Sequence, residues 1–152
     1  MPPMGALVKA MMINSAEFLL GNDFGGGNNR DKQGHGLLKL KNAMYFDDTA
    51  ERDLFVIGDF SNMQSLTTGE TRKYELTVIK GKGGSILPLK ATLVWHDAPA
   101  SSNSNKHLVN DLDLKVTAAD GQTFYPNGRT SRDNTNNAVR FCVDLFLALI
   151  VL

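Results

Sequence analysis

Apolar residues near the N-terminus recur every three or four positions, which is the spacing of one face of an α-helix. They are Met4, Leu7, Val8, Met11, Phe18 and Leu19. Gly21 stands where this pattern stops, and glycine commonly ends helices. We therefore expect an N-terminal helix that reaches Gly21 and buries a methionine-rich face in a core.

A polar, glycine-rich stretch at residues 21–34 predicts a loop. Its triple glycine is not followed by the Lys-Ser or Lys-Thr pair of a phosphate-binding loop, which disfavours phosphate binding. Residues 34–44 read GHGLLKLKNAM and predict a short strand-like entry into a helix. His35 lies between two glycines there, which favours a surface loop residue over a ligand.

From about residue 50 apolar and polar residues alternate, as they do in half-buried strands. The candidate strands cover residues 54–57, 73–78, 89–95 and 111–116. Turns are expected at Thr68-Gly69, residues 81–84, Asp120-Gly121 and Asn127-Gly128. Short strands separated by glycine turns predict an antiparallel β-sandwich or barrel. The pattern as a whole is that of an α+β chain.

The end of the chain departs from this pattern, because residues 139–152 read VRFCVDLFLALIVL. The apolar run at residues 145–152 is too short to cross a bilayer, which takes about 20 residues. It could be a final core strand that overruns its end. If it were exposed, such a run would promote aggregation.

The composition excludes several classes of protein. Apolar residues make up 42% of the chain and charged residues 21%, which is typical of a folded domain. Sixteen basic and sixteen acidic residues cancel, which argues against nucleic-acid or anionic-membrane binding. A single cysteine, Cys142, excludes an internal disulfide and a cysteine-rich zinc site. The N-terminus lacks a basic region before its apolar stretch, so no signal peptide is predicted.

The familiar catalytic motifs are absent from the sequence. It contains no Gly-x-Ser-x-Gly, Ser-x-x-Lys or His-Glu-x-x-His. Its histidines, His35, His96 and His107, do not share a metal-ligand spacing. We interpret them as loop or strand-end residues.

Oxygen-bearing side chains form two clusters late in the chain. Asp111 and Asp113 are two residues apart, on the same side of a predicted strand. Asp133 and Asn136 belong to a second cluster, together with Asn134 and Asn137. Calcium takes six to eight oxygen ligands of this kind, so these positions are candidates for a calcium site. The alternative is that they are solvated carboxylates and turn-forming asparagines.

Two stretches resemble the subtilisin-like serine proteases, or subtilases. The segment PPMGALVKAMMINSA and the later GHGLLKLKNAM are similar to the end of a subtilase catalytic domain. Residues 89–128, with LVW, DAP and LVNDLDL in order, are similar to the β-barrel that follows this domain in some subtilases. That barrel is itself similar to the jelly-roll P domain of kexin-type convertases. Asp133, Asn136 and Asn137 resemble the Asp-x-x-Asn-Asn step that comes next.

The resemblance implies a fold and a set of domains. Residues 1–46 would be the end of a subtilisin-like α/β catalytic domain, and residues 47–140 an antiparallel β jelly-roll or sandwich. Residues 141–152 would be an apolar tail of uncertain status. After the Asn-Asn step the family continues with an acidic residue and further strands, whereas this chain continues into its apolar end. We therefore expect a piece of a longer product, or a reading frame altered near residue 138.

The resemblance also implies a function for the full-length enzyme, which is proteolysis of protein substrates outside the cell. The catalytic Asp, His and Ser and the oxyanion-hole Asn of the family lie upstream of the matched segment. His96, Asp97 and the serines match none of those positions. We therefore expect no catalytic residue and no protease activity in this chain alone. The missing part of the catalytic domain would be its partner, and the resemblance favours calcium at the acidic clusters.

A different class of function stays open from the residues themselves. The chain could be a stand-alone, non-catalytic β-sandwich module that binds protein or carbohydrate through Tyr125 and the loop at residues 100–107. Against this, the predicted N-terminal helix has an apolar face that needs a partner.

Overall fold

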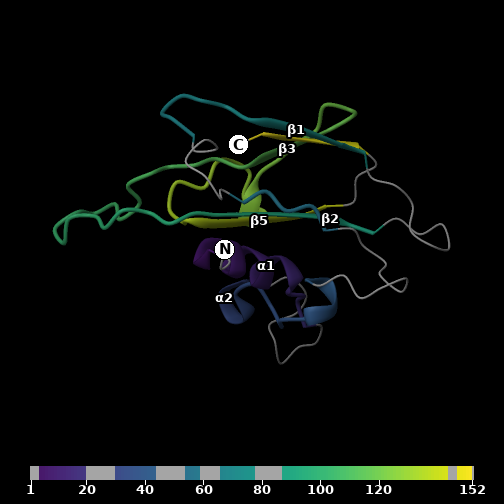
Figure 1. Ribbon diagram of the computed structural model, residues 1–152, viewed down its shortest axis with the longest axis horizontal. Coiled ribbons are helices and arrows are strands. Elements are labelled where there is room, and N and C mark those ends of the chain that lie inside the picture. The colour runs from purple at the N-terminus through teal and green to yellow at the C-terminus, as the bar shows by residue number, and fades with distance from the viewer. Residues whose placement is uncertain are drawn as a thin grey trace. The chain divides into compact units, whose positions relative to one another are not determined.

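The computed structural model describes residues 4–19, 30–43, 54–58, 66–77, 87–143 and 147–151. Its internal contacts divide the chain into a helical unit, Met1–Phe55, and a β unit, Val56–Leu152. Figure 1 labels several elements of each. The predicted domain limits at residues 46 and 140 stay predictions.

The N-terminal helix is shorter than the sequence predicts. Helix α1 spans Gly5–Ser15, and Ala16 is already extended. The reason is that Glu17 pairs with Leu37 as an isolated antiparallel bridge, with N–H···O distances of 2.9 and 2.8 Å. A strand-like pairing requires extended backbone, so the helix ends before Phe18 rather than at Gly21.

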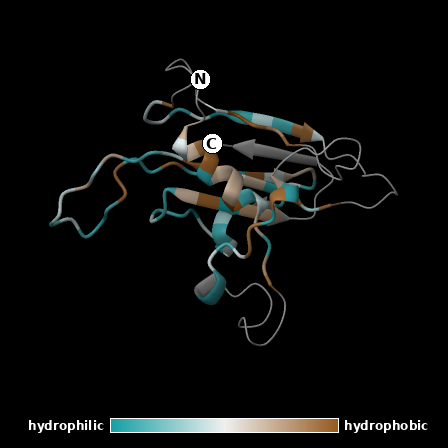
Figure 2. Cartoon of the chain, turned by 60° about the horizontal axis from the view of Figure 1, so that its bottom comes forward, coloured by the Kyte–Doolittle hydropathy of each residue, from teal (hydrophilic) through white to brown (hydrophobic). Residues whose placement is uncertain are grey.

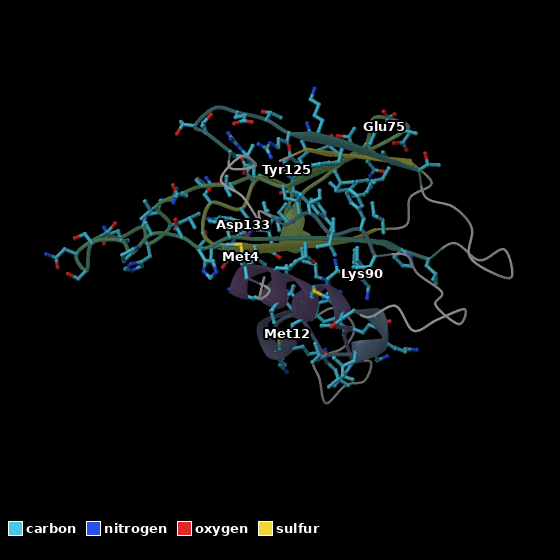
Figure 3. All side chains as sticks on the ribbon, in the orientation of Figure 1. Met4, Met12, Glu75, Lys90, Tyr125 and Asp133 are labelled. Atoms are coloured by element: carbon cyan, nitrogen blue, oxygen red, sulfur yellow. The ribbon has the colours of Figure 1, made fainter. Side chains whose placement is uncertain are left out.

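The predicted burial of a methionine-rich face is only partial. Met4 and Val8 of that face are 45% and 41% exposed. The other residues of the face are half-buried, namely Leu7, Met11, Phe18 and Leu19. Met12, which lies outside the predicted face, is 51% exposed. Met4 and Met12 are labelled on α1 in Figure 3. The buried residues of α1 are Ile13 and Ser15 instead, and only Ser15 is fully buried. The buried residues of the helix are therefore confined to its last turn.

The segment after α1 differs in part from its prediction. The expected loop at residues 21–34 contains a short helix, α2, at Arg30–Gln33, and residues 20–29 lie outside the described residues. The predicted strand-like entry is the Glu17–Leu37 bridge, and the helix after it is a single 3-10 turn, η2, at Leu40–Asn42.

The β unit contains six described strands. They are β1 (Lys73–Thr77), β2 (Leu89–Val94), β3 (Lys115–Ala118), β4 (Thr123–Phe124), β5 (Ala138–Val143) and β6 (Leu147–Val151). One antiparallel sheet has the order β1-β6-β3-β4, and a second pairs β2 with β5. A short 3-10 turn, η5, lies at Pro126–Gly128 before β5.

One core packs the residues of the two sheets together. Leu114, Val116 and Ala118 in and before β3 cluster with Val139 and Phe141 of β5. Side chains of β2, with Trp95 and Phe124, cover this cluster. Figure 2 shows the hydropathy of each element. The chain is thus a small mixed α/β protein with antiparallel strands, and its described strands form no closed barrel or jelly roll.

Two of the four predicted strands match the structure closely, and two do not. Strands β1 and β2 fall within residues 73–78 and 89–95. Residues 54–57 form no strand and stay exposed, with Phe55 at 63%. Strand β3 begins at Lys115, where pairing with Val151 of β6 starts, so residues 111–114 of the predicted strand belong to no described strand.

The predicted turns are confirmed where the structure describes them. Gly69 and Gly121 have φ of 83° and 86°, and Asn127 has φ of 57°. Such values suit glycine and asparagine. The turn predicted at residues 81–84 lies outside the described residues.

The apolar end of the chain is a strand in the middle of the larger sheet. Strand β6 pairs with β1 from Leu147 to Val151 and, on its other edge, with β3. Its backbone hydrogen-bonding groups are therefore directed to neighbours on both sides. Within the described part of the chain, no helix has the length and apolar character needed to cross a membrane.

Candidate functional site

The stretch that resembles the subtilase β-barrel contributes three segments, around Trp95, Asn110 and Asn137, which meet where β2 ends and β5 begins. Trp95 follows β2 directly, and Asn137 precedes β5. The Trp95 N–H donates to the Asn137 carbonyl at 3.3 Å, and the Asn137 side-chain amide donates back to the Trp95 carbonyl at 3.2 Å. Asn137 therefore prolongs the β2–β5 pairing by one step and fixes the start of both loops.

Asp97 anchors the far end of the loop that leaves β2. Its carboxylate accepts the backbone N–H of Val109 at 2.7 Å and that of Asn110 at 2.8 Å. The Asn110 side-chain amide and the Ala98 N–H donate to the same carboxylate, at 2.9 and 3.0 Å. Trp95 adds a bond from its indole Nε1–H to the Asn110 carbonyl at 3.0 Å. We call Trp95, Asp97, Val109 and Asn110 the loop clamp.

The loop clamp keeps Asp97 ionised. Desolvation raises the pKa of Asp97, but the hydrogen bonds from Val109 and Asn110 outweigh it, so the pKa stays below its usual value. A carboxylate whose pKa is lowered in this way makes a poor general base near neutral pH. Its chemistry fits an anchor for backbone amides.

Asp133 is the centre of a second, buried cluster, labelled in Figure 3. Its residue is only 2% exposed. The Asn127 side-chain amide donates to Oδ2 at 2.7 Å, and the Asn136 amide donates to both oxygens at 3.1 and 2.9 Å. Backbone N–H groups of Thr135 and Asn136 donate to Oδ1 at 3.1 and 3.3 Å, and Arg129 Nε lies 3.5 Å from Oδ2. Asp133 thus accepts bonds from residues on both sides of it in the chain.

The orientation of Asn127 is set by a second partner. Its side-chain oxygen accepts the Arg140 N–H at 3.2 Å, so its NH2 group must face Asp133. The residue has φ of 57°, which asparagine tolerates. Asn127 thereby ties η5 to both Asp133 and β5.

The pKa of Asp133 is lowered for reasons like those at Asp97. Desolvation raises the pKa, but the bonds from Asn127, Asn136 and Thr135 and the charge of Arg129 outweigh it. The buried carboxylate is therefore ionised and compensated by donors.

The structure brings together only two of the residues predicted to bind calcium. Asp133 and Asn136 are hydrogen-bonded, as above. Asp111 instead pairs with Lys106 at 3.0 Å, and Asp113 pairs with Arg132 at 3.1 Å. In the ranges that the structure describes, no group of three or more His, Cys, Asp or Glu residues is arranged to hold a metal.

The donor set around Asp133 does not fit a calcium ion as it stands. Calcium needs oxygen ligands, whereas Asn127 and Asn136 both turn N–H groups toward the carboxylate. Asp133 with Asn127 and Asn136 forms an anion held by amides. Calcium at the four residues stays a prediction.

The structural role of Asn127 was missed in the sequence. The Asn-Gly pair identified it as a turn residue, but not as the link between Asp133 and β5. The sequence signal for this role is an Asn-Gly turn followed a few residues later by an acidic residue, because asparagine tolerates φ > 0 in such a turn. Its second partner, the Arg140 N–H, depends on the tertiary fold.

Comparison with known proteins identifies relatives of this segment. The chain is 32% identical over 165 residues to a serine protease/ABC transporter B family protein, tagD, of Dictyostelium discoideum, covering 87% of this chain. The chain resembles one segment of a serine protease-related protein. A second protein of that name, tagB, of the same organism is 28% identical over 179 residues, covering 90% of this chain. The chain spans only 9% of the length of each relative, and no family model matches it.

Proposed function

We propose that the chain is a segment of a subtilisin-like serine endopeptidase. Residues 1–46 would be the end of its catalytic domain, and residues 47–140 most of a jelly-roll β domain that stabilises the enzyme or assists substrate access. The observation that carries the proposal is the similarity over 87% of the chain to a protein named a serine protease. Proteolysis of protein substrates outside the cell belongs to the full-length enzyme.

The bonding of the motif residues supports a structural role for this segment. The carboxylate oxygens of Asp97 and Asp133 accept hydrogen bonds from amide N–H groups of their own loops. These bonds give both carboxylates a structural role. Acyl transfer needs an activated nucleophile beside a base and an oxyanion donor set. We therefore propose that the chain alone is non-catalytic and acts by supporting a catalytic domain.

The first test is the intact mass of the native protein, captured from its source with an antibody to residues 89–114. We expect a species far above 16.6 kDa, the mass of this chain. A species at 16.6 kDa would contradict the proposal and turn attention to a stand-alone binding module.

A fluorophosphonate probe, which labels active serine hydrolases, tests whether activity belongs to the full-length enzyme and not to this chain alone. The captured native species should react, and the same species after heat denaturation should not. The purified 152-residue chain should stay unlabelled and should not cleave casein. Labelling of the purified chain would overturn the non-catalytic role.

Calcium remains part of the proposal as a separate question. Calorimetry of the chain with calcium and then with chelator tests it, because an ion that binds only the folded state raises the melting temperature. Asp113→Asn and Asp133→Asn should each abolish a calcium-dependent shift if these residues are ligands. An unchanged melting curve would remove calcium from the proposal.

A further inference from the structure

The loop between β2 and β3 is a largely exposed polar segment of the β unit. In Figure 1 it projects from the sheets of this unit, and in Figure 2 its tip is drawn as hydrophilic. Ser101, Ser102 and Asn103 are exposed at the tip, and Asn105 is exposed beyond them. Exposed loop tips with small polar residues are preferred sites of proteolytic cleavage.

The two ends of this loop are held, although its tip is weakly bonded. Asp97 on one side holds Val109 and Asn110 on the other. Within the tip, the backbone bond is a single turn from the Ser104 N–H to the Ser101 carbonyl at 3.0 Å. Opening this turn exposes an extended strand of chain without disturbing the loop clamp.

A cut at the tip leaves the unit held together by bonds that do not depend on the loop. The upstream fragment would keep β1, β2 and Asp97, and the downstream fragment would keep β3 to β6. Strand β2 stays paired with β5, and β1 with β6. The loop clamp and the shared core span the same cut.

We propose that the tip of this loop is a proteolytic processing site, cleaved between Ser101 and Ser104 by an endopeptidase that accepts small polar side chains. One water adds across the peptide bond, which leaves a carboxylate on one fragment and an amine on the other. The nucleophile and the proton transfers belong to the endopeptidase. The nicked β unit stays in one piece. This inference does not depend on the proposed function.

The position of the loop clamp also sets which bonds resist cleavage. Lys106 is exposed, but its side chain pairs with Asp111 and its backbone is bonded twice to Ser104. Leu108 is buried, and Val109 is already held by Asp97. An endopeptidase needs extended chain on both sides of the bond, so a trypsin-like enzyme should cut after Lys106 more slowly than an elastase-like enzyme cuts at the tip.

Limited proteolysis of the full chain tests the proposal, with elastase and trypsin under native conditions and intact-mass analysis of the products. We expect an elastase product ending between residues 101 and 104. Its two fragments should elute together on native size exclusion and separate only in denaturant. The proposal is overturned if elastase leaves this loop intact while it cuts the folded chain elsewhere, or if the nicked fragments separate under native conditions.

Two sets of variants sharpen the result. Asp97→Asn removes the anchor, so trypsin should gain the cut after Lys106, whereas Asp120→Asn, in the turn between β3 and β4, should leave the pattern unchanged. The double change Ser102→Pro and Asn103→Pro should abolish the elastase product without affecting the loop clamp. Persistence of the same product in this double variant would place the cut outside the tip and overturn the proposal.

Discussion

The helical unit and the β unit are stabilised by different kinds of interaction. The β unit has a contiguous apolar core, in which Val116, Val139 and Phe141 are 0%, 1% and 3% exposed. Among the described residues of the helical unit, the buried apolar ones are Ile13, Ala16 and Ala43, two of which are alanines. Burial of large apolar side chains is the main stabilising term in folding. The β unit therefore gains more stability from apolar burial than the helical unit does.

Polar bonds between segments hold the helical unit instead. The Gln33 side chain bonds both backbone groups of Leu19, at 2.8 and 3.1 Å. Asn42 donates to the Ser15 carbonyl and to the Glu17 carboxylate, at 2.9 and 2.7 Å. Each such bond contributes only about 1 kcal/mol net. The comparison teaches that polar bonds between segments contribute relatively more in the helical unit, and apolar burial relatively more in the β unit.

The largest effect is expected in the core of the β unit. Phe141→Ala should lower the free energy of unfolding by about 3–5 kcal/mol, because it leaves a cavity between β5 and the covering side chains. Urea unfolding followed by tryptophan fluorescence measures this, since Trp95 packs against the same core. Ile57→Ala, at a residue of the same unit that is 43% exposed, is the control and should change stability by less than about 0.5 kcal/mol. Equal effects from the two would contradict the assignment of the core.

The next largest effect breaks the helical unit. Gly36 has φ of 95°, and a Cβ there would lie 2.3 Å from the Glu17 carbonyl oxygen. Gly36→Ala should therefore cost about 3 kcal/mol of local stability and separate Glu17 from Leu37. Gly34→Ala is the control, because its φ of 59° is also positive but a Cβ there meets nothing within 4 Å.

Amide hydrogen exchange reads this out residue by residue. Protection at Glu17 and Leu37 should fall in Gly36→Ala and largely remain in Gly34→Ala. Protection in β2 and β5 should be unchanged in both variants. Loss of protection across both units would show that they do not unfold separately.

The polar cluster of the β unit should give an intermediate effect. Asp133→Asn keeps the shape but places an NH2 group among donors, so it should cost about 2 kcal/mol. Asp113→Asn is the control, since Asp113 and Arg132 are exposed partners and such pairs contribute less than about 1 kcal/mol. Urea unfolding of both variants measures the difference. A larger loss in Asp113→Asn would mean that Asp133 is not the residue that holds the turn.

The sequence predicted local features well wherever a short-range rule decides them. Turns at Gly69, Gly121 and Asn127 follow from residue types that adopt φ > 0, and strands β1 and β2 follow from alternation. Residues 54–57 have a strand-like composition but no paired partner among the described residues, so composition alone misled. Whether an extended segment becomes a strand depends on a distant partner.

The candidate site was predictable only in part. The resemblance listed Trp95, Asp97 and Asp133 along one ordered series of motifs but predicted none of their contacts, and ligand chemistry was inferred from oxygen atoms alone. In the structure, the two carboxylates accept backbone N–H groups instead, from Val109 and Asn110 at Asp97 and from Thr135 at Asp133. Backbone donors cannot be identified from residue types. For the apolar end, the sequence left a final core strand open but did not place it in the middle of a sheet, because the two neighbours of β6 are distant in the chain.

The smallest effect concerns acid, and it tests whether the loop clamp opens before the core. The pKa of Asp97 is lowered from 3.8, so its bonds stabilise the clamp above that pH and are lost only as pH falls through the lower folded-state value. Amide protection at Val109 and Asn110 should therefore persist at pH 4 and fall only at a pH below 3.8, ahead of protection in β5. The pKa of Asp133 is lowered in the same direction. Because Asp133 is buried, its hydrogen bonds should be lost only when the β unit unfolds. Simultaneous loss at the clamp and in β5 would show that the loop is held by the core rather than by the Asp97 carboxylate.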